Sequence, residues 1–149
     1  MSAAPLLRFR HEQSILEAGR GNALQACVAS ALGVAELARV PNFVEQPDYM
    51  AALNAFLEGN APRLALVKVD LSKAAQPEEN NAPRLPLPTA AGALCILVGK
   101  SPRGEHKHCV LARVAPDGSA LHIEHDPFPL GGGLRAPYAW AGFFALRLD

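Results

Sequence analysis

The chain has 149 residues, and its 14 Lys plus Arg balance 14 Asp plus Glu, which gives a formal net charge of zero. One domain is the natural expectation for this length, and it can bury roughly two-thirds of its unfolded surface. The balanced charge offers no basic field for nucleic acid or an anionic membrane. No run approaches the ~20 apolar residues of a membrane span.

The first twenty residues are mixed in character, and we expect them to be extended or irregular. They lack the apolar core of a secretory signal peptide. The three cysteines are an odd number without paired spacing, which argues against a disulfide scaffold. These features favour a soluble cytoplasmic protein in which residues 1–149 form a single domain. They do not indicate an oligomeric state.

Two helices are predicted in the first half of the chain. Asn22 is a typical N-cap for a helix that runs to about Leu32, and Gly33 is suited to end it. A second helix is predicted from Gln46 to Glu58, capped near Gln46 or Asp48, because apolar residues recur there at three- to four-residue spacing.

The second half is dominated by apolar segments typical of strands. The predicted strands cover residues 64–69, 91–99, 110–114, 120–124 and 143–148. Residues 71–91 are rich in Pro, Ala, Asn and Glu and are interpreted as a surface excursion. Pro116-Asp117-Gly118 supplies a turn between the third and fourth strands. Because helices precede strands, the sequence predicts an α+β fold with N-terminal helices packed against an antiparallel sheet.

His108 opens the first arm of this predicted hairpin, and Asp126 closes the second. A hairpin folds back on itself, so the two side chains can lie together. A carboxylate beside an imidazole fixes the tautomer and stabilises the charged ring, as a general base requires. Such a pair commonly serves a Ser or Cys nucleophile.

The natural place for a thiol nucleophile is the start of a helix, because free backbone N–H groups and the helix dipole favour the thiolate. The helix that follows Asn22 offers such a start, but its first residue is Ala23. Cys27 lies one turn further in, on the face that we assign to packing. We therefore interpret Cys27 as a small buried apolar residue.

Two blocks of the sequence resemble papain-like cysteine peptidases. The first is Gln13 with residues 21–30, Gly-Asn-Ala-Leu-Gln-Ala-Cys-Val-Ala-Ser. In the second, Cys-Val-Leu follows His108 and Pro follows Asp126. The order Gln, Cys, His, Asp is that of the family, and the two blocks cover about half the chain. The resemblance is closest to the bacteriocin-processing (double-glycine leader) peptidases and to small bacterial relatives.

The resemblance implies a papain-like fold and a thiol hydrolase that cleaves a peptide, isopeptide or other amide without a cofactor. It assigns the nucleophile position to Ala23, the general base to His108, the orienting carboxylate to Asp126 and part of the oxyanion hole to Gln13. The implied partner is a peptide or protein substrate. Ala has no thiol, so the chain as written is expected to be inactive.

Two explanations fit the alanine at position 23. The chain is either a natural pseudoenzyme or a carrier of an introduced Cys→Ala change. We favour the introduced change, because a chain freed from selection has no reason to keep Gln13, His108 and Asp126 together. Two other functions are compatible with the same residues: a papain-like module that binds a peptide without cutting it, and acyl transfer or deamidation through the same triad. Hydrolysis and transfer share one acyl-enzyme.

Other features near the second block have simpler interpretations. His and Cys are dense between residues 106 and 126, but they lack the paired spacing of a structural zinc site, so no metal site is expected. The run Gly131-Gly132-Gly133 lacks the context of a phosphate loop and is interpreted as a flexible connector. Phe128, Tyr138 and Trp140 are candidates for a substrate subsite.

Overall fold

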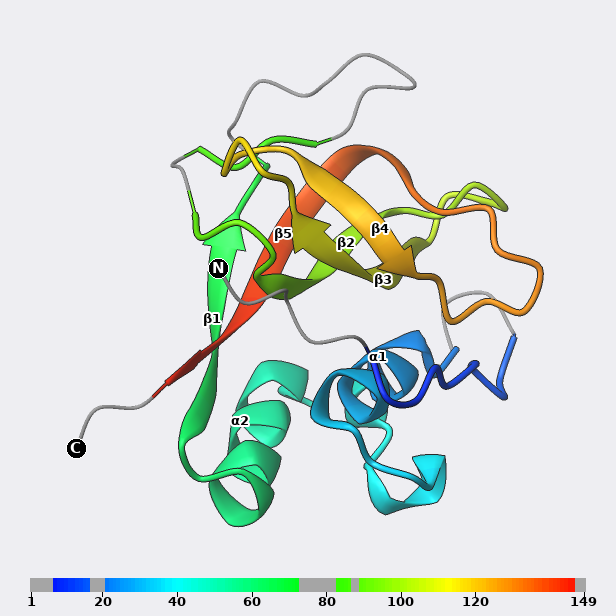
Figure 1. Cartoon of the computed structure of the whole chain (residues 1–149). Coiled ribbons are helices and arrows are strands. Elements are labelled where there is room, and N and C mark those ends of the chain that lie inside the picture. The colour runs from blue at the N-terminus through cyan, green and yellow to red at the C-terminus, as the bar shows by residue number, and fades with distance from the viewer. Residues whose placement is uncertain (1–6, 17–20, 73–82, 87–88, 147–149) are drawn as a thin grey trace.

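The computed structural model describes residues 7–16, 21–72, 83–86 and 89–146, and within them the fold is α+β, as predicted (Figure 1). The helical elements are α1 (Ala23–Leu32), η1 (Leu37–Arg39), η2 (Phe43–Glu45) and α2 (Tyr49–Asn60). The strands are β1 (Leu64–Asp70), β2 (Leu94–Lys100), β3 (Lys107–Val114), β4 (Leu121–His125) and β5 (Arg135–Leu146). No helix in the described ranges is long and apolar enough to span a membrane.

The first helix has the predicted bounds, and Gly33 ends it in the left-handed conformation with φ 69°. The second helix begins later than predicted, because Gln46 precedes a proline and stays extended. Asp48 is its cap and accepts the N–H of Ala51 at 3.0 Å. The helix continues to Asn60, past the predicted end at Glu58.

All neighbouring strands are antiparallel, in the order β1-β5-β2-β3-β4. The last strand was predicted too short, over residues 143–148, whereas β5 begins at Arg135. It lies between β1 and β2, and Phe143 pairs with Val67 on one side and Cys95 on the other. The strands on either side of β5 satisfy the hydrogen bonds of its backbone. The local hydrophobicity of the sequence does not show how far this pairing extends.

The predicted turn between β3 and β4 is confirmed. Gly118 has φ 80°, and Asp117 Oδ1 accepts the backbone N–H groups of the two residues that follow Gly118. These two hydrogen bonds lower the pKa of Asp117 to about 2. Further along the hairpin, a register shift places Leu111 opposite His125. Such a bulge redirects the end of a strand, and here Asp126 follows directly.

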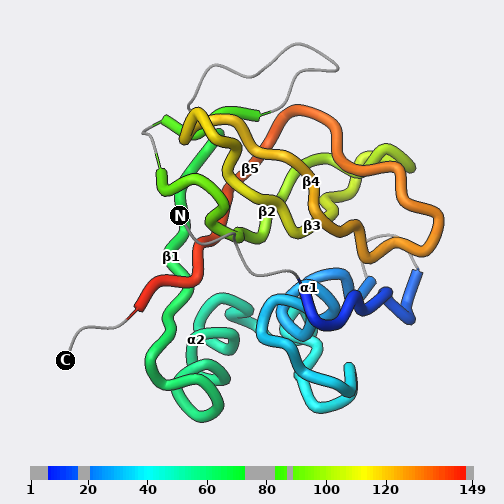
Figure 2. The backbone as a smooth tube through the Cα atoms, in the orientation of Figure 1, coloured from blue at the N-terminus to red at the C-terminus, as the bar shows by residue number. Residues whose placement is uncertain are grey.

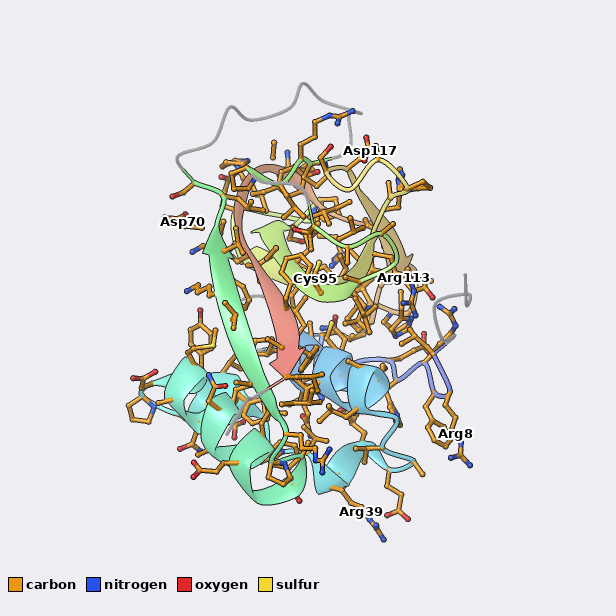
Figure 3. All side chains as sticks on the ribbon, turned by 60° about the vertical axis from the view of Figure 1, so that its left-hand side comes forward. Arg8, Arg39, Asp70, Cys95, Arg113 and Asp117 are labelled. Carbon is orange, nitrogen blue, oxygen red and sulfur yellow. The ribbon has the colours of Figure 1, made fainter. Side chains whose placement is uncertain are left out.

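Both faces of the sheet are buried along β2 and β3. Figure 2 shows α1 and α2 together against one side, where Ile96 and Val98 of β2 pack with the helices. The alternate residues of β2, Cys95 and Leu97, belong to a second core on the other face. Figure 3 shows the helices at the end of the molecule that carries Arg39, with the Asp117 turn at the opposite end.

The second core corrects the interpretation of residues 71–91 as a surface excursion. Leu71 and Leu85 are buried in this core, and Leu85 donates its N–H to Ser119 O. Residues 73–82 and 87–88 of the same segment lie outside the described residues. The apolar face of β2 and β3 must be shielded from water, and the apolar residues of this otherwise polar segment shield part of it.

Candidate functional site

The hairpin brings His108 and Asp126 into direct contact. His108 lies at the start of β3 and Asp126 comes directly after β4, and His108 Nε2 is 2.8 Å from Asp126 Oδ1. Both side chains are largely removed from solvent, with exposed fractions of 4% and 10%. The remaining ring nitrogen of His108, Nδ1, forms no hydrogen bond with the described part of the chain.

Asp126 is held by more than the imidazole. Its Oδ1 also accepts the N–H of Phe128 at 2.9 Å, and its Oδ2 accepts the N–H of Gly133 at 2.8 Å. Burial alone would raise the pKa of Asp126, but the hydrogen bonds from His108, Phe128 and Gly133 outweigh it and lower the pKa below its usual value. The carboxylate is therefore charged and fixed in orientation at neutral pH.

The glycine run was wrongly interpreted as a flexible connector. Gly131, Gly132 and Gly133 all have positive φ, at 70°, 105° and 69°. This backbone path is open to glycine and strained for other residues. It turns the chain back so that the N–H of Gly133 reaches Asp126. The run is a structural part of the His108–Asp126 pair.

Asn22 precedes α1 as predicted, but its side chain does not cap the helix. Its Oδ1 accepts the N–H groups of Ser14 and Ile15, each at 2.9 Å. Its Nδ2 donates to Ser14 Oγ and Gln25 Oε1. Asn22 therefore fastens the N-terminal segment to the helix, and its amide leaves the N–H groups of the first turn uncapped.

Gln13 lies on this fastened segment. Its backbone N–H donates to Pro127 O at 2.8 Å, which ties it to the residue after Asp126. Its side-chain Nε2 donates to Ile15 O at 2.9 Å. Its Oε1 is buried without a hydrogen-bond partner in the described residues. A buried amide oxygen without a partner is costly and suggests a missing ligand or water.

These residues meet in one cavity of about 270 Å³. Gln13, Ala23 and His108 all line it, although each residue is more than nine-tenths buried when its backbone is included. Asp126 lies behind His108 and is not part of the lining. Phe128 and Trp140 line the cavity as expected.

Tyr138 was wrongly grouped with these aromatic residues. It belongs to the second core, on the other face of the sheet, and burial raises its pKa.

Among the described residues, no group of three or more His, Cys, Asp or Glu side chains is arranged to hold a metal ion.

No protein-family model, curated protein or solved structure matches the chain. A carboxylate-oriented imidazole, an uncapped helix start and a buried amide share one cavity, and together they could serve a nucleophile at position 23.

Several lining residues were not anticipated from the sequence. Val44 and Tyr49 form part of an apolar wall, and Arg103 and Lys107 supply cations. The cations could have been found from sequence, because they lie within five residues of His108. Val44 and Tyr49 carry no such indication, since only the packing of η2 and α2 beside α1 brings them to the cavity.

Cys27 packs inside the protein, as predicted. Its side chain is fully buried, and its Sγ lies 3.9 Å from Cys109 Sγ on β3. Burial, followed by the contact with Cys109, raises the pKa of Cys27 well above its usual value. Burial also raises the pKa of Cys95, to about 12. Neither thiol is poised to act as a thiolate.

Proposed function

We propose that this cavity is the active centre of a papain-like thiol hydrolase whose nucleophile position is residue 23. The substrate would be a peptide, isopeptide or other amide. One observation carries the proposal: the first residue of α1 and an imidazole held by a buried carboxylate line the same cavity. The alanine makes the chain as written a non-cleaving form.

The proposed mechanism requires a thiol in place of the Ala23 methyl group. His108 Nε2 is engaged by Asp126, so Nδ1 takes the thiol proton and gives a thiolate–imidazolium pair. The thiolate attacks the carbonyl carbon, and His108 protonates the departing amine. Water then hydrolyses the thioester, with His108 as the base. Asp126 keeps the ring in one orientation throughout.

The oxyanion formed during attack would be stabilised at the helix start. The backbone N–H of residue 23 is one donor, because the side chain of Asn22 does not cap the turn. Gln13 supplies a second donor, because its Nε2 carries two N–H groups and donates only one of them, to Ile15 O.

Ala23 itself favours a second candidate function, a module that binds the peptide without cleaving it. With only a methyl group at position 23, the cavity, the His108–Asp126 pair and Gln13 all remain in place. Such a protein would hold its ligand non-covalently in the groove that a hydrolase would use. The two candidates differ in whether a thiol restored at position 23 becomes reactive.

The test compares alkylation of Ala23→Cys by iodoacetamide with that of the double variant Ala23→Cys/His108→Ala. We expect the single variant to be alkylated about 100-fold faster at pH 6, because an ordinary thiol with a pKa of about 8.5 is then almost fully protonated. Peptide mapping by mass spectrometry assigns the modified cysteine.

Ala35→Cys is a matched control, since residue 35 is exposed and lies beyond the C-terminal end of α1. It should be alkylated at the rate of an ordinary thiol and should not respond to His108→Ala. If Ala23→Cys behaves like Ala35→Cys, the hydrolase proposal is wrong and the binding module takes its place.

A further inference from the structure

One wall of the cavity is positively charged. Arg103 and Lys107 line it, together with His106 and His108, and the lining includes no Asp or Glu. The net charge of the whole chain is zero, so this is a local excess. It comes from the loop that joins β2 to β3 and from the first residues of β3.

Arg103 is held in place at this wall. Its guanidinium lies 3.5 Å from the centre of the Phe128 ring, and Nη1 donates to Gly131 O at 3.0 Å. Its backbone N–H donates to Ser101 Oγ. A guanidinium has five N–H donors, so several remain for a ligand. A stacked and anchored arginine is ordered in advance to bind a carboxylate.

The nearby carboxylates are engaged elsewhere. Glu105, between the two cations in sequence, has its Oε2 2.5 Å from Lys100 Nζ. Asp126 is taken by His108 and by two backbone N–H groups. Neither Arg103 nor Lys107 forms an ion pair with a residue in the described ranges.

The position of the cations indicates which part of a substrate they would meet. Lys107 and His108 both line the cavity from the start of β3. The Arg103 guanidinium lies over the Phe128 ring, which meets the His108 ring edge-on with centroids 6.5 Å apart. In the proposed reaction His108 delivers a proton to the departing amine. Groups around His108 therefore border the leaving group.

We infer that the substrate carries a carboxylate on its leaving-group side, next to the scissile amide. This inference rests on the proposed function for its orientation. The carboxylate is either the side chain of an acidic residue or the free α-carboxylate of a C-terminal residue. Arg103 and Lys107 bind it, while the apolar wall formed by Val44, Tyr49 and Trp140 contacts uncharged parts of the ligand.

The test measures the binding of peptides to the unsubstituted protein, which cannot cleave them because residue 23 is alanine. Four peptides share the sequence acetyl-Leu-Gly-X: X is Asp amide, Ala with a free carboxylate, Ala amide or Lys amide. The only tryptophan, Trp140, lines the cavity and reports occupancy by its fluorescence. Isothermal calorimetry repeats each titration, so that a silent Trp140 is not mistaken for absent binding.

At least one carboxylate peptide should bind about tenfold or more tightly than Ala amide, and Lys amide should bind most weakly. Comparison of Asp amide with the free Ala carboxylate identifies the source of the anion. Arg103→Gln and Lys107→Gln should each remove most of the preference. Arg63→Gln is the control, because Arg63 is exposed. It comes after the C-terminal end of α2, and Tyr49 lies at the N-terminal end.

Equal affinity for all four peptides, or no calorimetric binding of any, overturns the inference. An equal loss in Arg63→Gln also overturns it, because the preference would then follow overall charge. If Ala23→Cys shows a His108-dependent thiol but the peptides are not discriminated, only the specificity is wrong. If the peptides are discriminated but the thiol is ordinary, the carboxylate site stands and the hydrolase proposal fails.

Discussion

The two walls of the cavity are built on different principles. On the β-hairpin side, Asp126 accepts hydrogen bonds from His108, Phe128 and Gly133. On the helix side, Gln13 keeps a buried oxygen without a partner in the described residues, and the first turn of α1 has no side-chain cap. The Asp126 carboxylate is thus fully engaged without a ligand. On the helix side, the uncapped N–H groups lack an acceptor, which a bound carbonyl could supply, and Gln13 Oε1 lacks a donor.

The strongest contrast should be between position 23 and the native thiols. Cys27 and Cys95 are fully buried and do not line the cavity, so they react only when the structure opens. We expect DTNB to modify them at least about 1,000-fold more slowly in the folded protein than in urea. Ala23→Cys should add one fast-reacting thiol. Stopped-flow absorbance gives both rates, and rapid modification of Cys27 in the folded chain would contradict the packing described here.

The next effect concerns the hairpin wall. In the Ala23→Cys background, Asp126→Asn keeps the size of the side chain but removes its charge and places an amide where His108 and two backbone groups donate. We expect alkylation at pH 6 to slow by about 100-fold. Asp117→Asn, at the turn of the same hairpin, is the matched control. Equal slowing in both variants would mean that the hairpin, rather than the pair, was disturbed.

On the helix wall, Asn22→Ala should be strongly destabilising. It leaves the N–H groups of Ser14 and Ile15 without their acceptor and removes two further hydrogen bonds. The free energy of unfolding should fall by about 2–4 kcal/mol, measured by urea denaturation. Ser14→Ala removes only the hydroxyl acceptor and should cost about 1 kcal/mol. Similar losses in the two variants would show that Asn22 has no special role.

The smallest effect expected is a change in acid stability. Because the folded-state pKa of Asp126 is lowered, the unfolded chain takes up its proton first as pH falls. The stabilisation is complete above the unfolded pKa of about 3.9 and is lost as pH falls through the folded pKa. Asp126→Asn should therefore flatten the loss of unfolding free energy below about pH 4. If the unfolding free energy of the variant falls with pH as steeply as that of the parent, Asp126 does not contribute to acid stability.

The sequence by itself determined the local elements. Gly33 and the apolar spacing set the C-terminal bound of α1, and the Pro116-Asp117-Gly118 turn defined the hairpin, because helix-ending and turn residues act over a few neighbours. The hairpin also made the contact of His108 with Asp126 predictable, since a short connection limits where its two arms can go. The papain-like relationship stays a prediction.

Only the tertiary structure decided what surrounds that pair. The amide of Asn22 joins residues eight and seven positions away instead of capping α1, and the triple glycine bends to reach Asp126. The burial of Leu85 and the meeting of Tyr49 with Arg103 around one cavity also come from packing. These features depend on which long-range partners leave the fewest buried polar groups unsatisfied and cover the most apolar surface, and neighbouring residues do not encode that balance.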